Sequence, residues 1–408
     1  MTFKILSLDG GGFRGVISGR LLQTIEAVLQ EKRGQSLHDY FDLIAGTSTG
    51  SLLAAGVALK LDAAALLKVY ETRGEDIFPA NVRRQRKWRY LSQILGKSYT
   101  LYPHGEPNDD PAKQKVGLST VIRDNFGDAT IASVGEDITT ADGRVIEKPI
   151  LLVLAYDTLS RNTTFFASNN PEKNPRWYDH LPIWRLCTAS ASAPTFFPPY
   201  KLPYYQEGDD IPADVRDRKQ VLPHIDGGVS ANNPTLAAIS HALLTAESDI
   251  NNIFVLSVGT GKVTKPFTYE EVKNWGLLNW IGNLPNIFLD PSSEIGNSIS
   301  SQILNINSAN QRHVRLDFQL NNHLVDRPPG QDGRVLRKIS SSPTNSYLGR
   351  KVPEEIDDPT TYQAFIEAAD AYIEKGAVSF NGQWITVKDA IAQFIDLDGL
   401  GEPKQSVS

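Results

Sequence analysis

Apolar positions in the first part of the chain predict a strand, a helix, a second strand and a second helix. Lys4 to Leu8 and Asp42 to Ala45 are short apolar runs typical of buried strands. Between them, apolar side chains recur at the spacing of one helix face, at Val16, Ile17, Leu21, Ile25 and Val28. Small and apolar residues after Gly50 indicate a buried helix, and Asp62 is a suitable N-cap for the next. This order favours parallel strands joined by helical crossovers.

Two later apolar runs extend the same sheet. Ile150 to Ala155 and Ile253 to Val258 fit central strands that helices cover on both faces. We therefore expect a three-layer α/β/α fold with a mainly parallel central sheet. Strand patterns fade after Lys262, and Asp358-Pro359 suits the cap and first-turn proline of a helix running through Ala377. The C-terminal part is therefore expected to be a helical cap on the same domain.

These patterns predict one domain over residues 1–380. Length alone would allow two or three domains, but the predicted strands belong to one sheet. Residues 70–148 are irregular and rich in Pro, Gly and Asp, which indicates an elaborated insertion. Residues 262–380 are expected to be the mainly helical C-terminal part, and residues 381–408 an extension or tail.

A glycine-rich turn, Asp9 to Gly15, lies between the first predicted strand and its helix. Glycine permits positive φ and the close approach of another group, and a helix start leaves amide N–H groups pointing outward. The turn therefore suits an anion. Gly10, Gly12 and Gly15 also match the G-x-G-x-x-G pattern of dinucleotide-binding proteins in the same strand-to-helix position. On its own, this turn does not distinguish the two uses.

The segment Gly46-Thr47-Ser48-Thr49-Gly50 favours acyl chemistry. It fits G-x-S-x-G between an apolar strand and a helix, where flanking glycines permit the tight turn that lifts a serine hydroxyl off the sheet end. A dinucleotide fold would more naturally place an acidic residue at the end of this strand. A plain Gly/Ser/Thr turn is the structural alternative for the motif taken alone.

A third segment, Asp226 to Pro234, offers a base for Ser48. Gly227 and Gly228 let the chain bend so that the carboxylate can turn inward, and Pro234 is well placed to start a helix. An ordinary Asp-Gly turn would be the better explanation if this segment stood alone.

Together, the three segments resemble the patatin-like phospholipase family, whose pattern is a D-G-G-G-x-R/K-G loop, a G-x-S-x-G elbow and a D-G-G/A segment in this order. Cys187 to Pro199 is similar to the small-residue block that precedes the family's D-G-G, and Val255 to Gly261 is similar to its later strand. Weaker similarity continues through Trp275 to Pro291 and Glu355 to Asp358. The resemblance covers most of the chain, from Ile5 to about Phe380.

The resemblance implies a lipid acyl hydrolase, of the phospholipase A or galactolipase kind, that cleaves fatty-acyl esters of membrane glycerolipids without a cofactor. Carried over by position, Ser48 attacks the ester carbonyl, Asp226 takes its proton, and the amides of Gly10, Gly11 and Gly12 hold the oxyanion. The supporting positions are Arg14, Gly46, Gly50, Gly227 and Gly228. A solvated Asp is a weak base for an alcohol, so we expect a dry site that raises the pKa of Asp226.

Three other functions stay open. A Ser-His-Asp triad of an α/β-hydrolase esterase needs a histidine after Asp226, and three residues satisfy that order without a motif around them: His241, His313 and His323. A catalytically idle lipid-binding or signalling module would keep its lipid affinity without Ser48. An oxidoreductase built on the glycine turn would bind NAD or NADP.

Composition and charge exclude several classes. A formal net charge of -6 argues against a nucleic-acid partner, because phosphate binding needs a clustered excess of Lys and Arg. No two His or Cys residues stand at metal-ligand spacing, so no metal is expected. The single Cys187 and an N-terminus without a secretory pattern favour the cytoplasm. No apolar run reaches the roughly 20 residues that span a bilayer, which leaves peripheral membrane contact.

Two stretches are candidates for that contact. Arg83 to Arg89 contains five cationic side chains and Trp88, which suits either an anionic membrane surface or a solvated helix face. Trp275 to Leu289 is apolar and free of charge, and we interpret it as a cap over the acyl channel in preference to a membrane-inserting device.

Overall fold

The computed structural model describes most of the chain. The described ranges are 2–85, 100–134, 138–139, 145–146, 149–170, 176–204, 221–245, 248–306, 310–327, 334–335 and 337–397. Within one long helix, residues 277, 278 and 280–290 are described by their backbone alone.

Eight strands of the described ranges form the central sheet. In spatial order they are β10 (His313–Leu316), β9 (Ile253–Val258), β1 (Phe3–Leu8), β2 (Leu43–Thr47), β5 (Ile150–Asp157), β8 (Val221–Asp226) and β7 (Tyr200–Pro203), with β6 (Asn162–Ala167) also paired to β5. All pairs from β10 to β5 are parallel, and β6, β8 and β7 join through antiparallel pairs. The sheet is therefore mainly parallel, as predicted.

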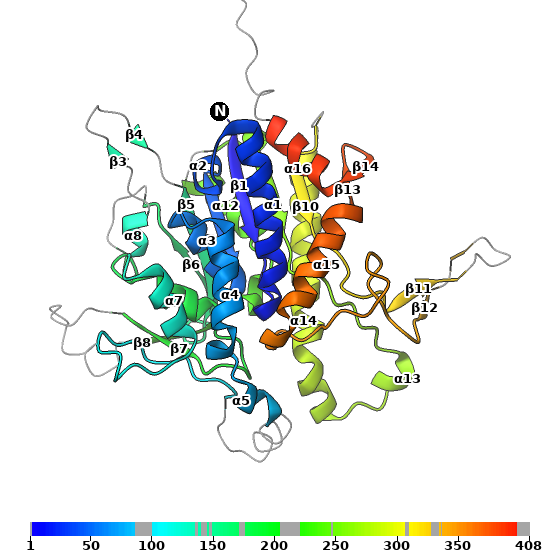
Figure 1. The fold of residues 1–408 in the computed structure, drawn as a ribbon, viewed down its shortest axis with the longest axis horizontal. Coiled ribbons are helices and arrows are strands. Elements are labelled where there is room, and N and C mark those ends of the chain that lie inside the picture. The colour runs from blue at the N-terminus through cyan, green and yellow to red at the C-terminus, as the bar shows by residue number, and fades with distance from the viewer. Residues whose placement is uncertain are drawn as a thin grey trace, which may run out of the picture.

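A hydrophobic core lies on each face of this sheet. Because successive side chains of a strand point to opposite faces, Leu6 and Leu8 pack into one core and Ile5 packs into the other. The first face is covered by α1 (Gly15–Arg33), α3 (Thr49–Ala58), α4 (Ala63–Ile77), α15 (Tyr362–Lys375) and α16 (Val387–Asp396), and the second by α12 (Thr235–Thr245) and α14 (Leu277–Asn305) (Figure 1). The predicted three-layer α/β/α fold is confirmed.

Short elements connect these layers. The helices are η1 (Gly12–Arg14), α2 (Leu37–Tyr40), α5 (Ala80–Arg84), α7 (Leu118–Phe126), α8 (Ile131–Val134), α9 (Ile183–Ser190), α11 (Gly228–Ala231), η2 (Ile250–Asn252), α13 (Tyr269–Val272) and η3 (Pro359–Thr361). The remaining strands form three hairpins: β3 (Ile138–Thr139) with β4 (Val145–Ile146), β11 (Leu324–Asp326) with β12 (Arg337–Ile339), and β13 (Ala377–Phe380) with β14 (Gln383–Thr386). Within the predicted insertion, residues 70–148, α7 packs on α4 and α9.

The C-terminal part differs from the prediction in two respects. Residues 262–380 contribute a strand to the central sheet, since β10 pairs in parallel with β9. The expected tail, 381–408, contains β14 and α16, and the buried face of α16 packs against α1. Asp358 caps η3, which leads directly into α15. The helix α15 ends at Lys375, before the predicted Ala377, because Ala377 begins β13. The C-terminal helices expected to form a cap therefore pack into the hydrophobic core that covers the central sheet.

The strand register brings the carboxyl ends of β2 and β8 together. Thr47 of β2 pairs with Leu154, and Asp226 of β8 pairs with the next residue of β5, Ala155. At both positions β6 occupies the other edge of β5, so β2 and β8 share one edge. Since β2 runs parallel to β5 and β8 runs antiparallel, the two strands point toward each other and end at the same place.

Candidate active site

Ser48 forms a sharp turn between β2 and α3. Its φ of 54° and ψ of -126° are rare for an L-residue. Gly46 and Gly50 make the turn possible, because a Cβ at Gly46 would lie 2.2 Å from the Gly50 carbonyl oxygen. A Cβ at Gly50 would lie 2.1 Å from the Leu8 carbonyl oxygen. The turn presents the Ser48 hydroxyl at the carboxyl end of the sheet.

Asp226 contacts Ser48 directly. The Ser48 Oγ donates to Asp226 Oδ2 at 2.6 Å, and the Gly228 amide donates to Oδ1 at 2.7 Å. The chain turns away behind the carboxylate at Gly227, where a Cβ would lie 2.2 Å from the Leu154 carbonyl oxygen. The predicted meeting of hydroxyl and carboxyl is present, with Oδ2 facing the serine proton.

The pair lies in a nearly dry environment. Ser48 is 8% exposed and Asp226 is 6% exposed. Burial raises the pKa of Asp226 to about 6, although the hydrogen bonds from Ser48 and Gly228 lower it. This direction agrees with the dry site expected from the sequence. A carboxyl with this pKa is ionised at neutral pH and is a stronger base than a solvated Asp.

The glycine turn lies beside the serine, but one of its amides is already used. A Cβ at Gly10 would lie 3.0 Å from Ser48 Cβ. The Gly10 amide donates to the Asn232 carbonyl at 3.0 Å, so the prediction that Gly10 supplies an oxyanion donor is corrected. Within the described ranges the amides of Gly11 and Gly12 donate to no acceptor. Gly11 precedes η1 and Gly12 is its first residue, just ahead of α1, where the helix dipole favours negative charge.

A buried ion pair from β10 anchors this turn. Arg315 donates to both carboxylate oxygens of Asp9, at 2.8 and 2.5 Å, and to Asp317 at 2.9 Å. Burial lowers the pKa of Arg315, but the charges of Asp9 and Asp317 outweigh it and raise that pKa above its ordinary value. Thr260 Oγ1 donates to the Gly10 carbonyl at 3.1 Å. The turn is therefore held by side chains from distant segments.

Comparison with known proteins decides the family. Residues 6–239 match the family model described as Patatin-like phospholipase. The chain belongs to the patatin-like phospholipase family. It is 30% identical over 319 residues to Patatin-like protein 1 of Oryza sativa subsp. indica, which covers 71% of this chain and 68% of that protein. It is 27% identical over 340 residues to Probable inactive patatin-3-Kuras 1 of Solanum tuberosum, which covers 76% of this chain and 77% of that protein.

Among solved structures, human GIVD cytosolic phospholipase A2 aligns over 97% of this chain and 62% of its own. The identity is 13% and the TM-score is 0.39. A TM-score this low does not establish a shared fold, so the membership of the patatin-like phospholipase family rests on the sequence match.

Two serines accept hydrogen bonds from the amides of Ser48 and Asp226, and no role for them was predicted. Ser190 Oγ accepts from the Ser48 amide at 2.9 Å and donates to the Leu154 carbonyl at 2.6 Å. The Ser192 carbonyl accepts from the Asp226 amide at 3.0 Å. Both serines lie in the small-residue block that resembles the family, so a usable signal was present in the sequence.

The histidines proposed for a triad lie elsewhere. His241 contacts Asn169 at 2.7 Å, and His323 contacts Glu354 at 2.6 Å. Burial lowers the pKa of His313 to about 3. In the described part of the patatin-like fold, no histidine contacts Ser48 or Asp226. The triad has no geometric support there.

Other predicted groups take structural roles. Burial raises the pKa of Cys187 to about 12, which fits a packing role for this thiol and not a nucleophilic one. Arg14 is half-buried at the end of η1.

Across the described ranges, no three His, Cys, Asp or Glu side chains form a possible metal site, and no helix is long and apolar enough to cross a membrane.

The two stretches considered for membrane contact are only partly described. Arg83 is mostly buried and pairs with Glu75 at 2.8 Å and Asp358 at 3.3 Å, so it is an internal anchor and not a free surface cation. Residues 86–89 lie outside the described residues. From Leu277 the second stretch forms the start of α14, whose backbone projects past the carboxyl ends of the strands (Figure 1). Its role as a cap stays a prediction.

Proposed function

We propose that this chain is a serine-dependent lipid acyl hydrolase that cleaves fatty-acyl esters of membrane glycerolipids through Ser48 and Asp226. The observation that carries the proposal is the 2.6 Å hydrogen bond from Ser48 Oγ to Asp226 Oδ2. A serine hydroxyl is a weak nucleophile until a base accepts its proton, and a buried carboxylate supplies that base. Membership of the patatin-like phospholipase family supports the lipid ester as the substrate.

In the acylation step, Ser48 Oγ attacks the ester carbonyl carbon and its proton passes to Asp226 Oδ2. The negative charge that develops on the carbonyl oxygen is stabilised by the amides of Gly11 and Gly12. The tetrahedral intermediate then collapses, the bond to the alcohol oxygen breaks, and Asp226 returns its proton to the leaving alkoxide. The fatty-acyl group stays on Ser48 as an ester.

In the deacylation step, water attacks the acyl-enzyme while Asp226 Oδ2 accepts one of its protons. The second tetrahedral intermediate breaks the bond to Ser48 Oγ, and the proton moves from Asp226 to that oxygen. The products are the fatty acid and the free enzyme. The Gly228 amide holds Oδ1 throughout, so the same oxygen of Asp226 serves both steps.

Peripheral membrane contact is part of the proposal. An exposed apolar row runs along the C-terminal half of α14, at spacings of three and four residues that place its members on one helix face. The row contains Ile295, Ile299, Ile303 and Ile306, which are 60%, 38%, 39% and 66% exposed. Gly296, which follows Ile295, lies close to the Asn233 carbonyl. The preceding residue, Asn232, contacts the glycine turn. An exposed apolar row that starts near the site suits a lipid surface, and the free thiol favours the cytoplasmic side.

The direct test is the release of fatty acid from mixed phospholipids and galactolipids by the wild-type protein and by Ser48→Ala. We expect Ser48→Ala to fall to background, because the covalent step has no substitute. Ser230→Ala is the matched control, since this exposed hydroxyl lies near the dyad without contacting it. Equal release by Ser48→Ala would remove the proposed nucleophile. Loss of activity in a His241, His313 or His323 variant, with Asp226→Asn still active, would favour the triad.

A further inference from the structure

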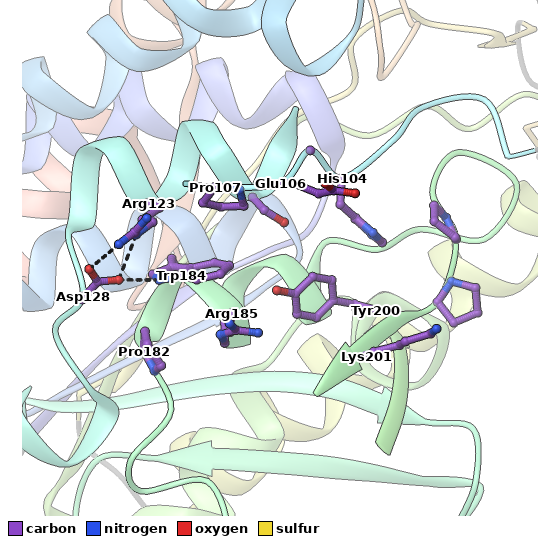
Figure 2. Close-up of a pocket in the computed structure, with 14 residues that line it drawn as sticks. His104, Glu106, Pro107, Arg123, Asp128, Pro182, Trp184, Arg185, Tyr200 and Lys201 are labelled. Carbon is purple, nitrogen blue, oxygen red and sulfur yellow. Dashed lines mark hydrogen bonds and ion pairs between the residues drawn. The ribbon is translucent and has the colours of Figure 1, made fainter. Parts of the chain in front are cut away.

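One hollow of the molecule is lined by no residue of the three motifs. It has a volume of about 630 Å³ and is bounded by the loop around His104, by α7, by the start of α9 and by β7. Figure 2 shows Arg123, Asp128 and Trp184 at one end, Arg185 and Tyr200 in the middle, and His104 and Lys201 at the other end. We call this hollow the α9 cleft.

Most charged groups of the α9 cleft are compensated by neighbours. Arg123 binds Asp128 at 2.8 Å and Asp109 at 2.7 Å. Asp128 also accepts from the Trp184 indole at 3.0 Å, which occupies the carboxylate further. Glu106 pairs with Lys115 at 2.7 Å. Arg123, Lys115, Asp128, Asp109 and Glu106 together carry a formal charge of -1, so positive potential in the cleft comes from other residues.

Two cations of the cleft form no ion pair. Neither Arg185 nor Lys201 lies within ion-pair distance of a carboxylate of the described ranges, although the charge of Arg185 adds to that of Arg123 in lowering the pKa of Asp128. Arg185 is half-buried, and its guanidinium lies 4.6 Å from the centroid of the Trp184 ring. Stacking on a ring face leaves the N–H groups at the guanidinium edge able to bind an oxyanion. Lys201 is exposed at the rim.

The position of Arg185 in α9 adds to the positive potential. Arg185 is the third residue of this helix, and the first turn contains no acidic residue. A cation in the first turn is unfavourable next to the positive end of the helix dipole, unless an anion compensates both. The fold therefore keeps a cation without an ion pair where helices ordinarily place a carboxylate.

Neutral donors lie in the same wall. The Tyr200 hydroxyl is close enough to Arg185 for the guanidinium charge to lower its pKa against the larger raising effect of burial. The Ser119 hydroxyl is 1% exposed and lies beside that of Tyr200, but it has no partner with full hydrogen-bond geometry among the described residues. Two neutral hydroxyls therefore lie in the wall of the cleft beside the Arg185 guanidinium.

We propose that the α9 cleft binds a phosphate ester, with the phosphate on Arg185, Tyr200 and Ser119 and the organic part toward Lys201. A phosphate supplies several acceptor oxygens and up to two negative charges, which matches a guanidinium flanked by neutral donors. The volume exceeds that of a phosphate alone, and Pro198 and Pro199, which directly precede Tyr200 and Lys201 in the chain, give the organic part apolar walls. The phosphate could belong to a soluble ester or to a lipid head group.

The α9 cleft is connected to the dyad by two hydrogen bonds. Ser192 Oγ donates to the Thr188 carbonyl at 2.6 Å, so the 2.8 Å contact between His104 Nε2 and Ser192 Oγ has the imidazole as donor. The Ser192 carbonyl accepts from the Asp226 amide. The cleft nevertheless uses none of the groups assigned to acyl transfer, so phosphate binding does not depend on the proposed function.

Calorimetric titration of the full chain with glycerol 3-phosphate, and sedimentation with phosphatidylcholine vesicles with and without phosphatidic acid, test the two sources separately. We expect Arg185→Gln to weaken binding about tenfold or more, because a charge-assisted contact is lost. Lys201→Glu, at an exposed position that leaves the fold intact, should also weaken it. Lys388→Gln removes an exposed cation from α16, distant from the cleft, and should bind like the wild type.

The outcomes separate clearly. Titration with glycerol 3-phosphate that both variants weaken supports a soluble ester, and phosphatidic acid-dependent sedimentation that both variants weaken supports a lipid head group. Binding of neither probe, or binding that both variants leave unchanged, overturns the proposal. Ser48→Ala should bind as the wild type does, so the loss of the proposed hydrolase activity leaves this result unaffected.

Discussion

The two halves of the candidate active site are held in place by different means. Ser48 and Asp226 are positioned by the backbone, because β2 and β8 end against successive residues of β5 and glycines permit the close turns. The glycine turn has backbone hydrogen bonds, such as that from Gly10 to Asn232, but it also depends on side chains, chiefly the ion pair between Asp9 and Arg315. A backbone arrangement persists when one side chain changes, whereas a side-chain anchor fails with a single substitution.

The Ser48–Asp226 pair and the glycine turn also differ in what they contribute to the proposed chemistry. In the proposed mechanism, the dyad supplies the nucleophile and the base, so its loss removes the reaction path. In the same mechanism, the glycine turn stabilises a charge that develops in the transition state, so its displacement slows the path. The expected effects of substitution therefore decrease from the dyad to the turn and then to the anchor of the turn.

The largest effect in this comparison is expected for Asp226→Asn. It should lower kcat by about 10²–10⁴-fold, the usual contribution of a general base, while the Gly228 contact stays available to the amide oxygen. The measurement is steady-state hydrolysis of a soluble short-chain ester. A variant that keeps more than a third of the wild-type kcat would show that another group takes the serine proton.

The same variant tests the burial of Asp226 through stability. The folded-state pKa, about 6, exceeds the ordinary value of 3.8 for an Asp carboxyl, so the stability that this group contributes is full below pH 4 and is lost as the pH rises through 6. At pH 7, the free energy of unfolding of Asp226→Asn should therefore exceed that of the wild type by about 2–3 kcal/mol. The variant should accordingly unfold at a higher temperature. Below pH 4 the difference should vanish, and a constant difference would show that burial of the charge is not its cause.

A smaller effect is expected for Gly12→Ala in the glycine turn. A Cβ at Gly12 would lie 2.4 Å from the Ile356 carbonyl oxygen, so the amides of the turn must shift. Because one oxyanion donor is worth about 10²–10³-fold in kcat, we expect a loss near the lower end of that range, with KM little changed.

Gly34→Ala is the matched control for that substitution. Gly34 has a φ of 63°, close to the 59° of Gly12, but a Cβ there would meet nothing within 4 Å. Both variants carry the strain of a positive φ, and only Gly12→Ala moves the turn. Equal kcat losses in the two variants would contradict a role for the turn in catalysis.

The sequence predicted the Ser48–Asp226 half of the site better than the glycine-turn half. The Ser48 elbow and the Asp226 segment are local patterns in which each glycine has a local steric reason, and the structure brings the two side chains together. The Arg315 anchor has no such pattern. It lies on a short strand with alternating charged and apolar residues, in a region where strand signals had faded and helix was expected.

The error at Gly10 has a similar cause. A glycine-rich turn before a helix indicates free amides, but it does not show which of them another loop will occupy. The Asn232 carbonyl that takes the Gly10 amide comes from the segment after Asp226, and this contact is set by the packing of α11 against the sheet. The overall layers were predictable from hydrophobic runs, whereas contacts between turns were not.

A weaker effect on rate, with a large effect on stability, is expected for Arg315→Gln. It leaves Asp9 and Asp317 buried without their cation, and breaking a buried ion pair in this way costs about 3–5 kcal/mol. Because the glycine turn loses its anchor, kcat should fall by about tenfold at a temperature where the protein stays folded.

Arg73→Gln is the matched control for the anchor. Arg73 also binds two carboxylates, Asp76 and Asp124, but all three side chains are 29% to 37% exposed. Exposed pairs contribute about 1 kcal/mol or less, so the melting temperature should change little. A large loss of stability in Arg73→Gln would mean that burial is not what distinguishes the Asp9 anchor.

The smallest effect expected is that of pH on the intact dyad. Asp226 must be ionised to accept the serine proton, so kcat/KM should rise with pH through about 6 and change only about twofold between pH 6 and pH 7. Burial lowers the pKa of both His104 and His241 to about 4, so neither histidine can account for a rise of kcat/KM centred on pH 6. The rate at which a fluorophosphonate labels Ser48 should follow the same curve, because labelling needs the same proton transfer. A limb near pH 4 in both measurements would mean that Asp226 is solvated when the enzyme works, and the contrast between a dry dyad and a side-chain-held turn would then lose its first half.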